Sequence, residues 1–361
     1  MDNKEVLLKV DHLCQYFGFN KAVDDVSFEV HKGEVFGLVG ESGCGKTTTG
    51  RSIIRLYDIT SGNVYFKGHR VAAGTLSYKK AIKAAEAEIK ALKKSMKEPD
   101  ADVSAIEAAI AKQKEIIEEQ KHEIKLALHD KKHCDKNLIT KIQMIFQDPI
   151  ASLDPRMTVR DIIAEGLVIN GMKDKNEIDE KVFKILELVG LVKEHASRYP
   201  HEFSGGQKQR IGVARAVIME PELIIADEPV SALDVSIQAQ VINLLNELRK
   251  ELGLTLLFIA HDLSVVKYFS DRIGVMYFGK MVELAPADEL FKNPLHPYTK
   301  SLLSAIPLPD PIYEKKRKRI TYNPLASHDY SVEGPTMREI TSGHFVYCNS
   351  AEFEQYSKEL K

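Results

Sequence analysis

A glycine-rich loop between an expected strand and an expected helix constrains the fold of this chain more than any other feature. Residues 34–39 are apolar and β-branched, as in a strand, and residues 47–56 have the composition of a helix. Between them stand Gly40, Glu41, Ser42, Gly43, Cys44, Gly45, Lys46 and Thr47, followed by Thr48. A loop of this kind surrounds phosphate groups with backbone N–H groups at a helix N-terminus. The sequence therefore predicts an α/β fold with a phosphate-binding site.

Each part of this loop suits a nucleotide. Its glycines permit backbone conformations and close approaches that a side chain would block. Lys46 supplies a positive charge that can reach the β- and γ-phosphates, and the Thr47 hydroxyl is placed to bind Mg²⁺. The loop alone predicts only a nucleotide-binding protein, with ATP and Mg²⁺ as the expected ligands.

Two later apolar runs end in chemically useful side chains. Residues 223–226 form an apolar run that ends in Asp227 and Glu228, and residues 256–260 form another that ends in His261. Continuous apolar runs are typical of parallel strands covered on both faces by helices, so the core is expected to be a largely parallel sheet. The first acid can hold Mg²⁺ through water and the second can orient an attacking water, although either could also cap a helix.

A second anion-binding helix start is predicted further along the chain. Ser204, Gly205 and Gly206 open an expected helix at Gln207, with a hydroxyl and bare backbone amides available to a phosphate. One chain thus carries two phosphate-binding ends, which is intelligible if each ATP is shared between two facing subunits. Two further polar positions accompany them, Gln147 after the run 144–146 and Asp234 shortly after the acids.

This ordered set of motifs, from Gly40 to His261, resembles the ATP-binding cassette (ABC) family. The resemblance implies a P-loop NTPase fold with a RecA-like core, an antiparallel β subdomain and a helical signature subdomain. It also implies ATP hydrolysis, in which Glu228 polarises the water and His261 contacts the γ-phosphate, while Gln147 and Asp227 complete the Mg²⁺ shell. Phe17 is the best match to the family's adenine-stacking aromatic, with Tyr16 as the alternative. Phe203 stands where the family more often has leucine.

Longer runs point to one branch of that family. Residues 198–207, 228–240 and 293–299 resemble the F-type ATPase subunits of oligopeptide and dipeptide importers. That resemblance implies two transmembrane permease subunits, an extracytoplasmic peptide-binding protein and a second, D-type ATPase subunit, with this chain at the cytoplasmic face of the membrane. It divides the chain into an ATPase domain at 6–285 and a C-terminal extension at 286–361. Importers of dipeptides or nickel remain alternatives.

The bulk composition excludes several other classes. The net charge of −2 in 361 residues gives no global field for nucleic acid, and no nucleic-acid partner is expected. Apolar runs fall far short of the ~20 residues of a membrane-spanning helix, and residues 1–5 show no start of a secretory signal. The cysteines Cys14, Cys44, Cys134 and Cys348 are scattered, so neither a disulfide framework nor an iron–sulfur cluster is expected.

Two segments depart from the family pattern. Residues 77–130 are rich in Ala, Glu, Lys and Ile and predict an inserted helical hairpin, with Pro99 at its turn and Asp100 or Asp102 as a cap. Its apolar seam is expected at these positions: Ile82, Ala85, Ile89, Leu92, Met96, Val103, Ile106, Ile110, Ile117, Ile124 and Leu128. The hairpin could be a solvated arm or a docking arm. The tail, with its basic run at 315–319, is expected to be an appendage with loop-like sequence.

These two segments leave a different class of function open. A soluble ABC-type ATPase that acts on DNA or ribosomes would have a use for the arm and the basic run, and a regulatory protein-interaction module is a third interpretation. The hairpin precedes Gln147, however, whereas DNA-repair members carry far longer coiled coils and usually place them after this position. The single cassette likewise differs from the paired cassettes of translation-type members.

Overall fold

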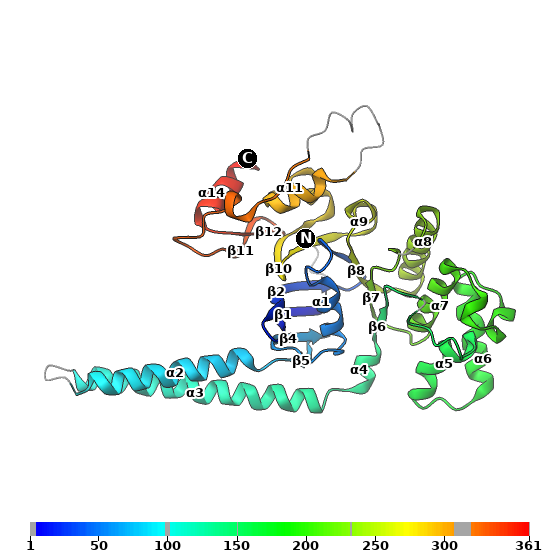
Figure 1. Ribbon diagram of the computed structural model, residues 1–361. Helices are drawn as coiled ribbons and strands as arrows, with labels where there is room; N and C mark the ends of the chain where they lie inside the picture. The colour runs from blue at the N-terminus through cyan, green and yellow to red at the C-terminus, as the bar shows by residue number, and fades with distance from the viewer. Residues whose placement is uncertain (1–4, 98–101, 150, 232, 307–318, 361) are drawn as a thin grey trace.

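The computed structural model describes residues 5–97, 102–149, 151–231, 233–306 and 319–360, and Figure 1 shows their arrangement. A central sheet has the strand order β11-β12-β10-β9-β3-β8-β7-β6. Its strands are β3 (Val35–Val39), β6 (Ile142–Ile145), β7 (Leu223–Asp227), β8 (Thr255–Ala260), β9 (Arg272–Tyr277), β10 (Lys280–Pro286), β11 (Thr336–Thr341) and β12 (His344–Cys348).

The middle of this sheet is parallel, as the apolar runs predicted. β3 pairs with β8 and β9, β7 pairs with β8, and β6 pairs with β7, all in parallel. Every residue of β3, β7 and β8 is buried, because side chains on both faces are covered. The carboxyl ends of these strands meet at one edge of the sheet, where the glycine loop also begins.

A second sheet of four antiparallel strands forms the predicted β subdomain. It contains β1 (Val6–Phe17), β2 (Asn20–His31), β4 (Ser61–Phe66) and β5 (His69–Ala73) in the order β2-β1-β4-β5. Phe28 of β2 stacks on Phe36 of β3 with ring centroids 5.0 Å apart. The two sheets therefore share one apolar core.

Helices surround the parallel strands and build the predicted helical subdomain. α1 (Lys46–Ile53) follows the glycine loop and lies against β7 and β8. α5, α6 and α7 form a separate helical group, seen at the right of Figure 1. The remaining bounds are α5 (Val159–Ile169), α6 (Lys175–Leu188), η1 (Lys193–Ser197), η2 (Pro200–Glu202), α7 (Gly205–Val217), α8 (Val235–Leu252) and α9 (Leu263–Phe269).

The predicted insert is a helical hairpin that projects from the antiparallel sheet (Figure 1), and we call it the arm. It consists of α2 (Leu76–Ser95) and α3 (Val103–Lys132), which pack against each other along their length and are followed by the short α4 (Lys136–Thr140). Asp102 caps α3 by accepting a hydrogen bond from the Ala105 N–H at 3.1 Å, as predicted. Pro99 and Asp100 lie outside the described residues.

The seam of the arm differs from the prediction at both ends, since Val103, at the start of α3, is 46% exposed. Ala85, Ile110 and Ile117 are buried as expected, but Ala127 is buried where Leu128 was predicted, and Leu128 is 55% exposed. The heptad that places Ile110, Ile117 and Ile124 on the seam next reaches position 127, because the spacing from 124 is three rather than four. The small Ala127 lets α3 approach β5 closely, and these two elements are in contact.

The C-terminal region is not an appendage, in contrast to the prediction. β12 pairs with β10 and β11 pairs with β12, so the tail adds two antiparallel strands to the central sheet. Residues 344–348 alternate between buried and half-buried, which is the pattern of a strand with one face on the core. The helices α10 (Ala287–Lys292), α11 (Pro297–Ser304), α13 (Pro324–Ser327) and α14 (Ser350–Glu359) complete the region. The basic residues at 315–318 lie outside the described residues.

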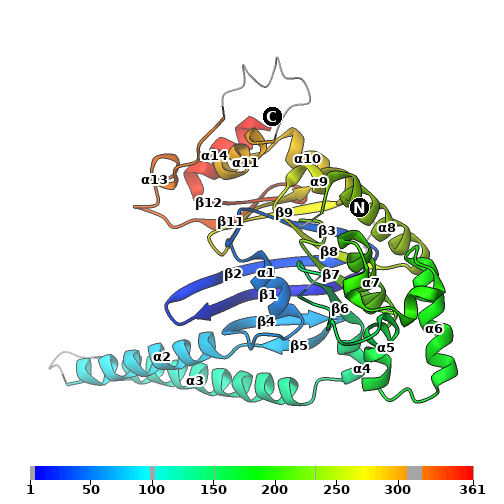
Figure 2. The ribbon, with the colours of Figure 1, turned by 45° about the vertical axis from the view of Figure 1, so that its right-hand side comes forward.

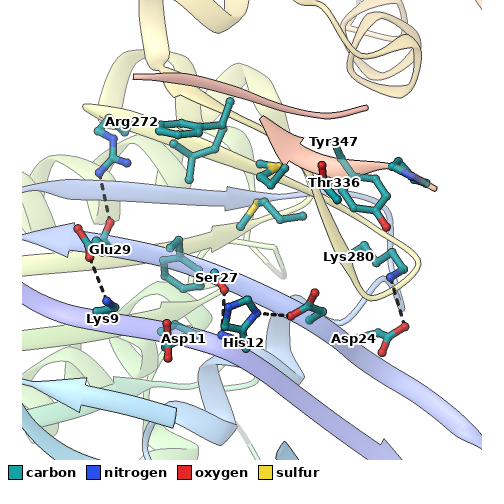
Figure 3. A pocket seen from close by; sticks show the side chains of 18 residues that line it. Lys9, Asp11, His12, Asp24, Ser27, Glu29, Arg272, Lys280, Thr336 and Tyr347 are labelled. Atoms are coloured by element: carbon teal, nitrogen blue, oxygen red, sulfur yellow. Dashed lines mark hydrogen bonds and ion pairs between the residues drawn. The ribbon is translucent and has the colours of Figure 1, made fainter. Parts of the chain in front are cut away.

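A cavity of about 600 Å³ lies between the antiparallel sheet and this C-terminal region (Figure 3). Met281, Met337 and Phe345 contribute apolar surface to its lining. Charged side chains in the lining pair with one another: Lys280 with Asp24 at 3.3 Å, His12 with Asp25 at 2.6 Å and Lys9 with Glu29 at 3.9 Å. Within the part of the chain that the structure describes, no helix has the length and apolarity to cross a membrane.

Candidate functional site

The glycine loop is held close to neighbouring backbone, which explains its composition. A Cβ atom on Gly40 would lie 2.2 Å from the Met276 carbonyl oxygen, and one on Gly45 would lie 2.2 Å from the Ala22 carbonyl oxygen. Both glycines also have positive φ angles, 151° and 106°. Any side chain there would displace the loop from β9 and β2, so glycine is required by space as well as by conformation.

Lys46 and Thr47 lie at the start of α1, directly after this loop. The Lys46 ammonium donates to the carbonyl oxygens of Gly40 at 2.8 Å and Glu41 at 2.9 Å, and its residue is only 3% exposed. The Thr47 hydroxyl donates to Asp227 Oδ1 at 2.7 Å. The loop, the α1 N-terminus and the end of β7 therefore form one continuous polar surface.

Glu228 is the point at which the predicted catalytic side chains meet. Its Oε2 accepts a hydrogen bond from Gln147 Nε2 at 3.0 Å and lies 3.2 Å from His261 Nδ1. Its Oε1 lies 3.9 Å from the Lys46 ammonium. The geometry thus brings three residues that are far apart in the sequence, Lys46, Gln147 and His261, to the carboxylate of Glu228. Gln147 and His261 come shortly after the ends of β6 and β8, and Lys46 begins α1.

The backbone at Glu228 is also unusual. Its φ angle is 44°, a left-handed conformation that a non-glycine residue adopts at a cost. The surroundings hold it there: the Glu228 N–H donates to the Ile259 carbonyl at 3.0 Å, and the Ser231 hydroxyl donates to the Glu228 carbonyl at 3.1 Å. With the backbone held in this conformation, Glu228 Oε1 lies 3.9 Å from the Lys46 ammonium.

Asp227 provides a test of whether the site suits a divalent cation. The residue is fully buried, and its Oδ2 atom has no hydrogen-bond partner within the described structure. Burial raises the pKa of Asp227 above its ordinary value, although the hydrogen bond from Thr47 opposes this shift. A buried carboxylate oxygen beside a hydroxyl matches the oxygen ligands that Mg²⁺ prefers. Thr47 and Asp227 therefore fit the predicted metal, whereas Gln147, the third predicted ligand, donates to Glu228 in this structure.

The second predicted anion site is a capped helix start. Ser204 and Gln207 form a reciprocal capping box at the N-terminus of α7, with the Ser204 N–H donating to Gln207 Oε1 at 3.0 Å. A Cβ atom on Gly206 would lie 2.6 Å from Ile237 Cγ2, so glycine permits α7 to pack on α8. Gly205 and Ser204 are exposed, whereas Phe203 is buried. The leucine-to-phenylalanine departure therefore lies in the core, beneath the exposed motif.

Ser204 does not join the Glu228 cluster. No hydrogen bond or ion pair in the described ranges connects residues 204–207 to Lys46, Asp227 or Glu228. Asp234 is exposed at the N-cap of α8, where, unlike Ser204 on α7, its side chain makes no cap bond. These residues form a second exposed surface, as expected if they serve a nucleotide held by another subunit.

The two candidate adenine-stacking aromatics differ in availability. Phe17 is 45% exposed and meets Tyr57 edge-on, with ring centroids 5.2 Å apart. The Tyr16 hydroxyl instead donates to Asp24 Oδ1 at 2.6 Å. An open ring face is needed for stacking, which favours Phe17.

One residue of the site was missed by the sequence reasoning. Tyr298, at the start of α11, is 1% exposed, and its hydroxyl oxygen accepts the Glu41 N–H of the glycine loop at 3.0 Å. His296 caps α11 by accepting the Tyr298 N–H at 3.1 Å. Glu283, fully buried on β10, accepts the N–H groups of Leu295 and His296 and lies 2.8 Å from His344 Nε2. Tyr298 and His296 belong to the run 293–299, whose resemblance to the importer branch is the sequence signal for this contact.

A groove of about 720 Å³ lies next to Gln147, between the end of α1, β6 and the helical group. Its lining includes Arg51, Ile54, Phe146, Gln147, Ile169 and Met219. Ile169, at the end of α5, is 76% exposed. The groove therefore offers a concave surface of mixed apolar and polar side chains directly beside Gln147, which contacts Glu228.

Comparison with known families agrees with this geometry. The profile described as ABC transporter matches residues 23–139 and 103–231, which together span more than half of the chain. The chain belongs to the ABC transporter family. A second profile, described as the C-terminal region of oligopeptide/dipeptide transporters, matches residues 282–332. This ABC protein is thus an ATPase.

Relatives with curated names cover nearly the whole length. An oligopeptide transport ATP-binding protein, OppF, from Bacillus subtilis is 55% identical over 98% of this chain and 99% of its own. OppF from Streptococcus mutans is 47% identical over 99% of both chains, and the dipeptide transport ATP-binding protein DppF from Lactococcus lactis is 47% identical over 94% and 92%.

Solved structures show the same fold at lower identity. CbiO1 from Clostridium perfringens, part of the ABC transporter complex CbiONQ, matches with a TM-score of 0.56 at 23% identity over 80% of this chain and 92% of its own. A dimeric ATP-binding cassette in a post-hydrolysis state bound to ADP and phosphate matches with a TM-score of 0.55 at 22% identity, over 78% and 99%. These likenesses confirm the predicted P-loop NTPase fold.

Proposed function

We propose that this chain is the ATP-hydrolysing subunit of an ABC importer of oligopeptides, at the cytoplasmic face of the membrane. The observation that carries the proposal is the convergence of Gln147, His261 and Lys46 on Glu228, beside the glycine loop. The names of relatives at 47–55% identity support the peptide as cargo.

The residues of this chain take distinct roles in the reaction. The glycine loop and Lys46 bind the phosphates, and Phe17 stacks on the adenine. Glu228 accepts a proton from the attacking water, while His261 contacts the γ-phosphate and Gln147 orients the carboxylate. Bound to Thr47, Asp227 and Gln147, Mg²⁺ would neutralise charge on the β- and γ-phosphates.

The second half of the site comes from a facing subunit. Ser204, Gly205 and Gly206 lie on a surface separate from Glu228, which supports a pairing in which each ATP is held between the loop of one subunit and the Ser204 motif of the other. The partner is a second, D-type ATPase subunit. Asp234 lies at the start of α8 on the same exposed side and serves this interface.

Coupling to transport uses the groove beside Gln147. An element of one of two permease subunits docks on Ile54, Phe146 and Ile169, so closure of the ATPase pair moves the permease. An extracytoplasmic peptide-binding protein supplies the cargo to the permeases.

Replacement of Glu228 by glutamine tests this mechanism. Glu228→Gln keeps the shape of the side chain but removes the base, so ATP hydrolysis by the assembled transporter should fall by about 100-fold or more. Phosphate release and peptide uptake are measured together, with Glu251→Gln, an exposed position on α8, as the matched control. Unchanged hydrolysis in Glu228→Gln would overturn the role of Glu228. Recovery of the chain with ribosomes or DNA and without permeases would overturn the importer assignment.

A further inference from the structure

Gln147, whose side chain contacts Glu228, lies in an irregular connection between a strand and a helix. β6 ends at Ile145, two residues before Gln147, and α5 begins only at Val159. The Gln147 side chain is exposed, and its Nε2 donates to Glu228 Oε2 at 3.0 Å. Neither the strand ladder nor a helix fixes this side chain, so its reach to Glu228 depends on what holds the connection in place.

A side chain of α7 holds this connection on both sides of Gln147. The Arg215 Nη1 atom donates to the Ser152 carbonyl oxygen at 2.6 Å, and the guanidinium carbon lies 5.9 Å from the centre of the Phe146 ring. Phe146 directly precedes Gln147, and Ser152 follows it. Arg215 thus joins a point before Gln147 to a point after it, and we call this pair of contacts the Arg215 clamp.

Asp148 brings the two contact points of the clamp close together. Its backbone carbonyl accepts the Ser152 N–H at 3.2 Å, and its carboxylate accepts the Ala151 N–H at 3.0 Å. These bonds fold the chain back, so that Ser152 lies near the start of the connection. One guanidinium can therefore reach both points, and loss of the clamp would release Gln147 together with this turn.

The charge of Arg215 is not neutralised by a carboxylate. Among the described residues it forms no ion pair, and Glu165 of α5 acts on it only as a nearby charge. The side chain is half-buried, and burial lowers the pKa of Arg215 from its ordinary value, against the effect of Glu165. Withdrawal of an unpaired charge from water has a cost that an apolar side chain in the same space would avoid. The contacts of the guanidinium with the connection offset this cost.

α7 links the clamp to the helical group. It packs on α5 and α6 and also on β6, and Figure 2 shows it beside β6. The groove beside Gln147 is lined by the clamp itself, through Phe146, Ser152 and Arg215. Movement of α7 relative to the sheet would therefore pull on Ser152 and displace Gln147 from Glu228.

We propose that Arg215 is a positioning residue for hydrolysis, which holds Gln147 in reach of Glu228 and makes that reach follow the movement of α7. The inference rests on the proposed function, in which Glu228 activates the water, and it adds the residue that couples this step to the helical group. No hydrogen bond joins Arg215 to Glu228 within the described ranges. Arg215 therefore acts through Gln147 and not on the substrate.

Steady-state hydrolysis by the assembled transporter tests this role. Arg215→Met keeps an apolar stem but removes the charge and the hydrogen bond to Ser152, so kcat should fall about tenfold. The KM for ATP should stay within about twofold, because the clamp does not contact the glycine loop. Lys184→Met removes a charge at an exposed position on α6 and is the control, which should keep the wild-type kcat.

A double-mutant cycle with Gln147→Ala separates positioning from packing. Because Arg215 acts through Gln147, the double variant Gln147→Ala, Arg215→Met should have the kcat of Gln147→Ala alone. Losses that multiply would overturn the proposal, since Arg215 would then act independently of Gln147. Arg215→Lys keeps the charge but not the planar guanidinium, and it replaces Arg215→Met in the cycle if that variant does not assemble.

Hydrogen exchange of the purified full chain gives a readout that does not depend on hydrolysis. The peptide that carries Gln147 should exchange about tenfold faster in Arg215→Met, from the loss of a charge-assisted hydrogen bond, while α6 exchanges as in the wild type. Wild-type exchange of this peptide would overturn the proposal. A wild-type kcat in Arg215→Met, with hydrolysis lost in Glu228→Gln, would remove this inference alone and leave the proposed function standing.

Discussion

Single residues of the site could be predicted where they follow strands. Asp227, Glu228 and His261 come directly after β7 and β8, and the carboxyl ends of adjacent parallel strands meet at one edge. Sequence order therefore implied their convergence in space. Tyr298 could not be placed in this way, because 257 positions separate it from its partner Glu41 and no periodicity links the two.

The Tyr298 hydroxyl positions the glycine loop, and its removal should weaken nucleotide binding. Tyr298→Phe leaves the ring in place but takes away the acceptor for the Glu41 N–H. Loss of one such hydrogen bond should lower ATP affinity by roughly three- to tenfold. Binding of a fluorescent ATP analogue is the measurement.

The control for this change is Tyr268→Phe, since Tyr268 is 86% exposed. Equal affinity in Tyr298→Phe and in the control would show that the contact does not position the loop. A fall in thermal stability with unchanged affinity would show a purely structural role.

Elements with regular periodicity were predicted well, and those set by distant partners were not. The apolar runs of β7 and β8 and the heptads of α2 and α3 are local patterns, and all four elements exist. The seam shifted by one residue, from Leu128 to Ala127, at the end of α3 that contacts β5, and Val103 at its other end is exposed. β12 is paired with β10 across a long stretch of chain, and only that pairing turns a short alternating run into a strand.

The cap of α11 should make stability depend on pH. Burial, with smaller contributions from His328 and Lys300, lowers the pKa of His296 to about 3. An unfolded histidine has a pKa of about 6.5, so the unfolded chain binds more protons below that value and the free energy of unfolding falls with falling pH. At pH about 5 the loss is about 2 kcal/mol.

A non-titrating cap isolates this contribution. His296→Asn keeps an acceptor at the N-cap, so it should flatten the fall in denaturant midpoint between pH about 6.5 and 5. His122→Asn, at an exposed position on α3, is the control and should keep the wild-type slope. An unaltered slope in His296→Asn would contradict the assignment.

The molecule as a whole is organised by one sheet that the sequence did not reveal in full. The motif order predicted the parallel strands and the helical group, because each motif has a fixed place in such folds. The buried Glu283 joins β10, the start of α11 and His344 of β12, and this polar junction combines residues from three separate stretches. Contacts between residues so far apart in the sequence are decided by packing and hydrogen bonding that exist only in the folded protein.

Removal of the last strands should therefore destabilise the entire protein. A chain ending at Pro335 lacks β11, β12 and α14, so β10 becomes an unpaired edge and Glu283 loses His344. Loss of this hydrogen-bond partner and of the packing of β12 on β10 together cost about 3–5 kcal/mol, which corresponds to a fall in Tm of roughly 10 °C. Differential scanning fluorimetry and light scattering would follow both effects.

His344→Gln in the full-length chain separates the two causes, because it keeps the strand and removes only the imidazole. It should lower Tm without aggregation, whereas the truncated chain should also aggregate through its open edge. A truncated chain with the wild-type Tm would show that the extension contributes no stability to the core.

The continuous sheet also determines how the parts of the molecule move together. β6, at the groove, and β12, in the extension, belong to one hydrogen-bonded sheet with five strands between them. Such a sheet resists shear, so its strands turn together and carry the glycine loop with them. The chain passes between this sheet and helices α5 to α7 through residues 146–149, 151–158 and 218–222, and α7 also packs on β6 and α8. Force applied at the groove is therefore expected to shift the helical group against the sheet, at these connections and where α7 packs on β6 and α8, while the C-terminal extension moves together with the glycine loop.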